Sequence, residues 1–154
     1  MSTAHPTLLI GSDHAGFPLK EYLRGQFSNS YTMVDVGCYS EDSVDYPRIA
    51  SAVASGILQQ GHPAVGILLC GSGNGVCMSA NRFQGIRAAL CWNVEIATLA
   101  RLHNNANVLC LPARFVDQEV AWNIVKAFLE TPFEGGRHLR RIELIENVNS
   151  IEGP

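Results

Sequence analysis

The sequence has little charge and no long hydrophobic run. Of its 154 residues, 16% are charged, and the net charge is −3. That balance disfavours broad attraction to nucleic acid or to an anionic membrane surface. The longest apolar run, Ala64 to Cys70, is about a third of the roughly 20 residues that a membrane-spanning helix needs. No basic segment followed by an apolar one precedes Thr7, so we expect no targeting signal and a cytoplasmic protein.

Cysteine pairs of the kind that bind zinc or form a disulfide framework are also missing. The five cysteines are an odd number at irregular spacings, with no Cys-x-x-Cys motif and no paired histidine ligands. We therefore expect free thiols and a reducing compartment. The chain length fits one domain, and 47% hydrophobic residues with so few charges predict apolar surface buried in a core, in a subunit interface, or in both.

Short apolar runs alternate with segments of helical periodicity. Strands are predicted at 7–11, 31–36, 64–70, 86–91 and 108–111. A helix is predicted after each strand. The predicted helices are 19–27, about 46–57, a short helix that ends at 80, 94–104 and 117–128. This alternation predicts an α/β fold with a mostly parallel five-stranded sheet and helices on both of its faces.

The C-terminal segment departs from the alternation. Residues 134–141 lead into an extra predicted helix, and we expect this extension, 134–154, to pack on a neighbouring subunit within one domain that spans 1–154. Arg137 and Arg141 lie four residues apart and therefore on one side of that helix. Such a pair suits a phosphate group, although a solvated helix face would look the same.

Unusual polar residues follow several of the predicted strands. Asp13 and His14 follow the first strand, Cys70 ends the third, and the end of the fourth helix supplies His103 and Asn104. Ligands of open α/β sheets bind at the carboxyl ends of the strands, so we expect these groups to converge. The simpler alternatives are a helix cap at Asp13, a small buried hydrophobe at Cys70 and a helix-dipole contact at His103.

A glycine-rich loop, Gly71-Ser-Gly-Asn-Gly75, directly follows Cys70. Such a loop can turn several backbone N–H groups toward one point, where they stabilise an anion, or it can be a plain tight turn. It is neither a Walker loop nor a dinucleotide fingerprint, because Gly-Lys-Ser/Thr is missing and Val76 stands where a third glycine would be. The start of the following helix favours the thiolate of Cys70, which makes that residue a candidate base or nucleophile.

Several linked motifs resemble one known family. They are Gly11-Ser-Asp-His-Ala-Gly16, Asp45-Tyr46-Pro47, Cys70-Gly-Ser-Gly-Asn-Gly75, Ala80-Asn81-Arg82, Gly85-Ile-Arg-Ala88, Arg101-Leu-His-Asn-Asn-Ala-Asn-Val108 and Glu134-Gly-Gly-Arg-His138. In this order, from about Leu8 to Arg141, the pattern is similar to the family shared by ribose-5-phosphate isomerase B and galactose-6-phosphate isomerase. The resemblance implies a Rossmann-like three-layer αβα sandwich, a homodimer that can pair into a tetramer, an active site between two subunits, and no metal or cofactor.

The resemblance also implies a reaction and a set of site residues. An aldose phosphate, ribose 5-phosphate, and a ketose phosphate, ribulose 5-phosphate, interconvert through a cis-enediolate. By position, Cys70 matches the base, Ser72 the hydroxyl that moves protons between O1 and O2, and His103, aided by Asp13, the group that opens the sugar ring. The matched substrate-binding positions are Asp13, His14, Tyr46, Gly71, Ser72, Gly73, Asn74, Gly75, Asn104, Arg114, Arg137 and Arg141. Some relatives use a glutamate directly after the loop instead of the cysteine, but Val76 occupies that position here.

Two alternatives remain open at this point. One is an isomerase of six-carbon sugars, acting on allose 6-phosphate or galactose 6-phosphate, because the depth of the pocket cannot be read from the residues. The other is a phosphosugar-binding module without catalysis. The presence of Cys70, Ser72, Asp13 and His103 together speaks against the second alternative.

Overall fold

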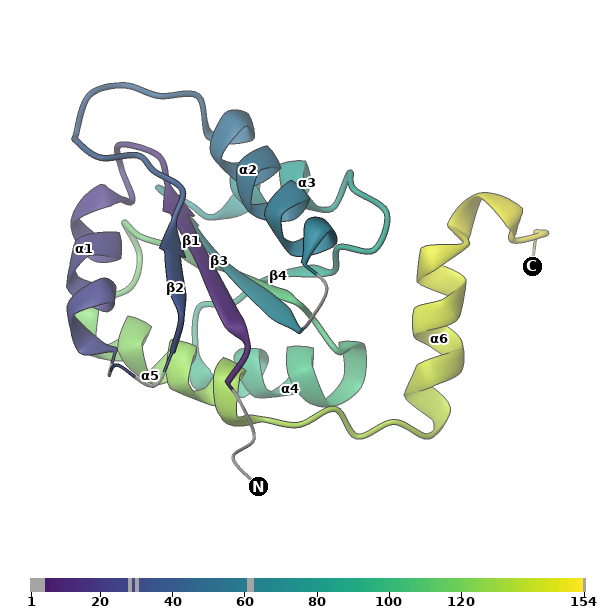
Figure 1. Ribbon diagram of the computed structural model, residues 1–154. Helices are drawn as coiled ribbons and strands as arrows, with labels where there is room; N and C mark the ends of the chain where they lie inside the picture. Colours follow the sequence, from purple (N-terminus) through teal and green to yellow (C-terminus); the bar gives the residue numbers. More distant parts are fainter. Residues whose placement is uncertain (1–4, 28, 30, 61–62, 154) are drawn as a thin grey trace.

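Five parallel strands form one sheet in the computed structural model, which describes residues 5–27, 29, 31–60 and 63–153 (Figure 1). The strands are β1 (Thr7–Ser12), β2 (Met33–Asp35), β3 (Ala64–Cys70), β4 (Ala88–Leu90) and β5 (Val108–Pro112). Their order across the sheet is β2-β1-β3-β5-β4, and every neighbouring pair is parallel. The predicted five-stranded parallel sheet is confirmed, with β3 at its centre.

Helices cover both faces of this sheet. They are α1 (Phe17–Gln26), α2 (Tyr46–Gln59), α3 (Asn74–Ala80), α4 (Val94–Asn104), α5 (Gln118–Glu130) and α6 (Arg137–Glu146). In Figure 1, α1, α4 and α5 lie on one face and α2 and α3 on the other, whereas α6 stands apart from the rest. This arrangement confirms the three-layer sandwich with an extra C-terminal helix. In the described part of the chain, no helix has both the length and the apolar character required to cross a bilayer.

The central strand contributes alternate side chains to two separate cores. Ile67 and Leu69 pack with the helices on the α1, α4 and α5 face, and Leu68 and Cys70 pack with α2 and α3. All four side chains are nearly or completely buried. Because successive side chains of a strand point to opposite faces, a continuous apolar run is what a strand covered on both sides requires. The side chain of Cys70 therefore belongs to the α2–α3 face.

The two edge strands are shorter than the sequence predicts. The second strand covers 33–35 rather than 31–36, and the fourth covers 88–90 rather than 86–91. Each of these strands pairs with the sheet on one side only, β2 with β1 and β4 with β5. Only the paired residues adopt strand geometry, although the flanking residues have strand-like composition.

Two helices also begin or end away from their expected positions. The third helix begins at Asn74, within the predicted glycine loop, directly after Gly73 in the left-handed conformation with φ +77°. The alignment of Ile142, Ile145, Val148 and Asn149 predicts a terminal helix through 149. The helix ends instead at Glu146, and a short 3₁₀ turn, Val148–Ser150, follows it. The predicted start of the fifth helix is confirmed, because the side chain of Asp117 accepts a hydrogen bond from the Val120 N–H at 2.8 Å.

Gly16 lets the loop after β1 lie against the end of β3. A Cβ atom at this position would come within 2.7 Å of the Leu69 Cβ and 2.8 Å of the Leu69 carbonyl oxygen. The Gly16 N–H also donates to the Asp13 carboxylate at 3.0 Å. The absence of a side chain at Gly16 thus places Asp13 beside the carboxyl end of β3.

We predict that Gly16→Ala lowers the free energy of unfolding by about 1–3 kcal/mol, because the added methyl group must displace the β3 backbone or the loop. Urea unfolding followed by circular dichroism measures this change. Gly25→Ala is the matched control, since a Cβ there meets nothing within 4 Å, and alanine in a helix raises stability by about 0.5–1 kcal/mol relative to glycine. Equal midpoints for Gly16→Ala and the wild type would contradict the packing argument.

Candidate active site

Three chain segments are joined at the carboxyl end of β3 by main-chain hydrogen bonds. The Asp13 N–H donates to the Leu69 carbonyl at 3.1 Å, and the Ala113 N–H donates to the Cys70 carbonyl at 2.9 Å. One residue further, the Arg114 N–H donates to the Gly71 carbonyl at 3.0 Å. These bonds extend the pairing of β1, β3 and β5 beyond the strands. Asp13, Cys70 and Arg114 are therefore held on adjacent segments, as the sequence predicts for residues at neighbouring strand ends.

The two polar residues after β1 have different surroundings. Asp13 is 7% exposed, and its carboxylate accepts the Gly16 N–H described above. His14 is half-buried, and its Nδ1 accepts a hydrogen bond from the Val44 N–H at 3.3 Å. Accepting at Nδ1 means that the neutral ring carries its proton on Nε2. His14 can thus donate this proton to a ligand while it connects the β1 loop to the segment before α2.

The loop after Cys70 turns sharply into α3. Gly73 has φ +77° and is buried against Leu90 and Leu111, so a side chain is excluded there. Ser72 is exposed, and its Oγ accepts a hydrogen bond from the Asn74 N–H at 3.3 Å. This turn places the Ser72 hydroxyl and the glycine-rich backbone directly beside the end of β3.

Tyr46 and Arg114 border the loop on its two sides. A Cβ at Gly75 would come within 2.6 Å of the Tyr46 ring, and one at Gly71 within 3.1 Å of the Arg114 guanidinium. Tyr46 is 41% exposed, and Arg114 is also exposed. The Tyr46 ring and the Arg114 guanidinium lie against glycines, which have no side chains, and together they form a surface suited to a small anionic ligand.

Cys70 lies beside the glycine loop, whereas Cys91 and Cys110 are buried elsewhere in the fold. Burial raises the pKa of Cys91 to about 12, with a further contribution from Cys77, and burial also raises the pKa of Cys110. Both of those residues are therefore protonated thiols at neutral pH. Cys70 is 4% exposed and is the cysteine that directly precedes the loop. All five cysteines lie in the described part of the chain and are free.

His103 and Asn104 do not join this group within one chain. They end α4, just before β5 begins, and the start of β5 pairs with Gly66 whereas its end pairs with Cys70. The intervening strand residues, at about 3.3 Å each, separate the carboxyl ends of the strands (the carboxyl edge of the sheet) from their amino ends (the amino edge) by roughly 13 Å. The predicted convergence of His103 and Asn104 with the other polar residues is therefore wrong for a single chain, because the helix after a strand returns to the amino edge of the sheet.

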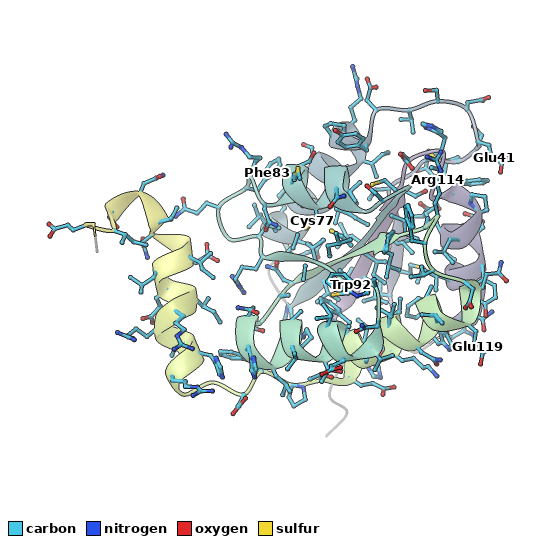
Figure 2. The ribbon with its side chains drawn as sticks, turned by 180° about the vertical axis from the view of Figure 1, so that it is seen from behind. Glu41, Cys77, Phe83, Trp92, Arg114 and Glu119 are labelled. Carbon is cyan, nitrogen blue, oxygen red and sulfur yellow. The ribbon has the colours of Figure 1, made fainter. Side chains whose placement is uncertain are left out.

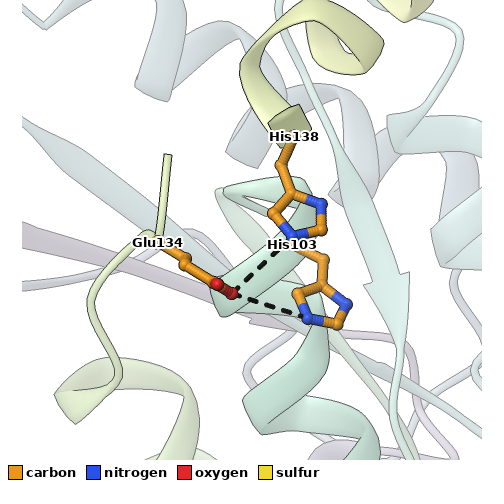
Figure 3. Close-up of side chains that lie close together, drawn as sticks. All are labelled: His103, Glu134 and His138. Carbon is orange, nitrogen blue, oxygen red and sulfur yellow. Dashed lines mark ion pairs between the residues drawn. The ribbon is translucent and has the colours of Figure 1, made fainter. Parts of the chain in front are cut away.

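At that opposite edge, His103 lies in a cluster with Glu134 and His138 (Figure 3). The Glu134 Oε2 is 3.7 Å from the His103 Nε2 and 3.6 Å from the His138 Nε2, and the two imidazole rings stack with centroids 4.3 Å apart. Burial, followed by the charge of His103, lowers the pKa of His138. Glu134 and His138 are not among the site residues predicted from the sequence, although an acid and a histidine four positions apart are a recognisable signal.

Arg137 and Arg141 lie beside this cluster, in the first two turns of α6. Both are exposed, four residues apart on the helix, and neither forms an ion pair with another described residue. In Figure 2, α6 and Arg114 lie at opposite ends of the molecule. The arginines of the predicted phosphate site are thus divided, with Arg114 at the carboxyl edge of the sheet and Arg137 and Arg141 at the amino edge.

A cavity of about 840 Å³ lies between the C-terminal segment and residues 81–89. Asn104 lines it, together with Arg87 and Glu146, but neither Cys70 nor the glycine loop does. The cavity is therefore not the place where the candidate catalytic residues meet.

Comparisons with known proteins assign this arrangement to a family. The family model described as Ribose/Galactose Isomerase matches residues 8–145. Ribose-5-phosphate isomerase B of Escherichia coli is 42% identical over 142 residues, covering 92% of this chain and 95% of that protein. The crystal structure of a ribose 5-phosphate isomerase from Thermotoga maritima is similar with a TM-score of 0.89 and 50% identity, covering 93% of this chain and 99% of that one. Ribose-5-phosphate isomerase B of Mycoplasma genitalium, with bound ribulose-5-phosphate, has a TM-score of 0.88 and 42% identity, covering 95% and 97%.

Proposed function

The chain belongs to the ribose/galactose isomerase family, and from this premise we propose that it interconverts ribose 5-phosphate and ribulose 5-phosphate. The observation that carries the five-carbon assignment is the ribulose 5-phosphate bound in a relative of the same fold. The carboxyl end of β3 supports the reaction, because a thiol, a carboxylate, a hydroxyl and a row of backbone N–H groups lie there together.

Proton transfer is assigned to Cys70. Its thiolate removes the proton from C2 of the open-chain sugar, and the electron pair of that bond forms the C1–C2 double bond of the enediolate. The N–H groups of the loop from Gly71 to Gly75 stabilise the negative charge that develops on oxygen. Ser72 moves a proton between O1 and O2, and the proton held by Cys70 returns to C1.

The rest of the site is assigned to a second subunit. His103 opens the sugar ring with the aid of Asp13, but these two residues lie at opposite edges of one chain. In a homodimer that brings the carboxyl edge of one subunit to the amino edge of the other, the residues of both edges meet. Those of the carboxyl edge are Asp13, His14, Tyr46, Cys70, Ser72 and Arg114, and those of the amino edge are His103, Asn104, Arg137 and Arg141. Such a dimer unites the divided arginines around one phosphate.

The C-terminal extension, residues 134–154, supplies a contact surface for this dimer. Leu139, Leu144 and Ile145 of α6 are 51%, 45% and 49% exposed. Large apolar side chains that are half exposed along one short helix are typical of a surface covered by another subunit. We assign this helix to the dimer interface.

The proposed function is tested by the initial isomerisation rates of the purified protein on ribose 5-phosphate, allose 6-phosphate and galactose 6-phosphate. We expect kcat/KM to be highest for ribose 5-phosphate. Turnover of a six-carbon sugar phosphate alone would agree with the proposed mechanism but contradict the assignment of ribose 5-phosphate as the substrate. No turnover with any of the three sugars would contradict an isomerase and favour a binding module.

We predict that Cys70→Ala lowers kcat by at least about a hundredfold, as removal of a general base does, with little change in substrate affinity. Steady-state kinetics and substrate binding by calorimetry measure the two effects. Cys77→Ala is the matched control, because this half-buried thiol lies in α3 and takes no part in the proposed reaction. Retained activity in Cys70→Ala would show that another group is the base.

Mixing two inactive variants tests the two-subunit site. Cys70→Ala and His103→Gln each remove one essential group, and a mixed dimer regains one complete site only if each site takes its thiol and its imidazole from different chains. We predict recovery of about a quarter of the wild-type rate after co-refolding of equal amounts, as random pairing in a two-fold dimer gives. Absence of recovery, despite dimers of normal size by light scattering, would place both groups in one chain.

A further inference from the structure

Three chain segments bring potential metal ligands together around His103 (Figure 3). His103 ends α4, Glu134 lies in the connection between α5 and α6, and His138 lies in the first turn of α6. One ligand atom from each residue lies within 4.8 Å of the other two. The rings of the two histidines stack at an interplanar angle of 13°. The proposed reaction uses only His103 of this cluster.

The cluster holds a polar atom whose bonding is incomplete. The side chain of His138 is 6% exposed, and its Nε2 has no hydrogen-bond partner among the described residues. The Glu134 Oε2 is too distant for a hydrogen bond at 3.6 Å. Buried side-chain nitrogens almost always have a partner, so this Nε2 indicates a ligand between the three side chains.

We propose that His103, Glu134 and His138 bind a divalent transition-metal ion, with zinc as the best fit. Two imidazole nitrogens and one carboxylate oxygen form a three-ligand zinc set that leaves the fourth position for water or substrate. Magnesium and calcium fit poorly, because both prefer oxygen ligands.

The distances to Glu134 require only a small closure of the cluster, whereas the stacked imidazole rings require the exposed ring of His103 to turn so that both rings aim a nitrogen at one ion. Two ligands at about 2.1 Å from a tetrahedral zinc ion lie roughly 3.4 Å apart, compared with the 3.6 and 3.7 Å between Glu134 and the two histidines. The side chains of Glu134 and His103 are 57% and 39% exposed, and therefore have room to move. His138 is the buried, fixed member toward which the other two close.

Positive charge nearby limits the affinity of the site. Glu134 contributes one negative charge, whereas Arg137 and Arg141 lie in the same two turns of α6 as His138. Repulsion between these guanidinium groups and a dication makes binding weaker than at a structural zinc site. The site is therefore suited to an ion that binds and leaves with changes in its concentration.

Metal binding at this place interferes with the proposed reaction. A metal ion on His103 ties its imidazole to Glu134 and His138 and prevents the ring from becoming the protonated acid, so the loaded enzyme loses ring opening. This inhibition rests on the proposed function, but the binding itself does not. Zinc then acts as a reversible inhibitor that binds directly to His103.

Binding is tested with the full chain after treatment with a chelator and removal of that chelator. Calorimetry with Zn²⁺ and the visible spectrum with Co²⁺ are compared for the wild type, His138→Gln and Glu134→Gln. His5→Gln is the control, because it removes an exposed histidine that is not part of the cluster. Circular dichroism checks that each variant is folded.

We expect one ion per chain in the wild type and in His5→Gln, and at least about tenfold weaker binding in the two cluster variants. The Co²⁺ spectrum should show no thiolate charge-transfer band. Wild-type affinity in both His138→Gln and Glu134→Gln would overturn the proposal, and so would a thiolate band, which would place the ion on cysteine.

Inhibition is measured separately, as turnover of ribose 5-phosphate with and without Zn²⁺. We expect Zn²⁺ to inhibit the wild type and His5→Gln, to leave His138→Gln and Glu134→Gln active, and to be reversed by chelator. Equal inhibition of all four proteins would overturn the inhibitory role. If the protein shows no isomerase activity, the proposed function fails, and calorimetry and the Co²⁺ spectrum alone decide the metal site.

Discussion

The candidate site depends on main-chain hydrogen bonding at the carboxyl end of β3. This strand pairs with β1 and β5 along its length, and the pairing continues past the strand ends through the bonds to Leu69, Cys70 and Gly71. Backbone bonds fix the positions of Cα atoms more firmly than flexible side-chain contacts do. As a result, the backbone positions of Asp13, Cys70 and Arg114 are set by the sheet itself, and the glycine loop begins from a fixed point.

The parallel direction of the strands has a second consequence. Each strand ends at the carboxyl edge, and each following helix carries the chain back to the amino edge. Cys70 ends a strand and His103 lies in the last turn of a helix, so the two residues are at opposite edges. This separation is the reason for proposing a site shared by two chains, and the arginines of one chain are divided in the same way, with Arg114 at one end of the sheet and Arg137 and Arg141 at the other.

The position of α6 links the amino edge to the rest of the fold. At its start, the ring of His138 stacks on that of His103. At its end, the carboxylate of Glu146 pairs with the Arg87 guanidinium at 2.5 Å and accepts the Gly85 N–H at 2.9 Å. The 840 Å³ cavity is lined by Glu146 and by the residues that follow it, up to Ser150. Attachment at its two ends holds the helix, with its exposed arginines and apolar side chains, in the position from which we propose that it contacts a second subunit.

The sequence by itself determined the layers of the fold and the group of residues at the carboxyl edge. The alternation of apolar runs and helical segments predicts a parallel sheet because few other folds bury such a pattern. Asp13, His14, Cys70 and the glycine loop were found because each lies at the end of a strand or just after it. The extent of the edge strands was overestimated, since composition does not reveal where pairing stops.

Only the tertiary structure decided which edge His103 occupies and that Glu134 and His138 join it. These three residues come from separate segments, and their meeting depends on the direction in which α4 runs and on the path from α5 to α6 (Figure 1). Local sequence patterns carry the period of a strand or a helix, but the approach of distant segments is set by packing between elements, which no single segment encodes.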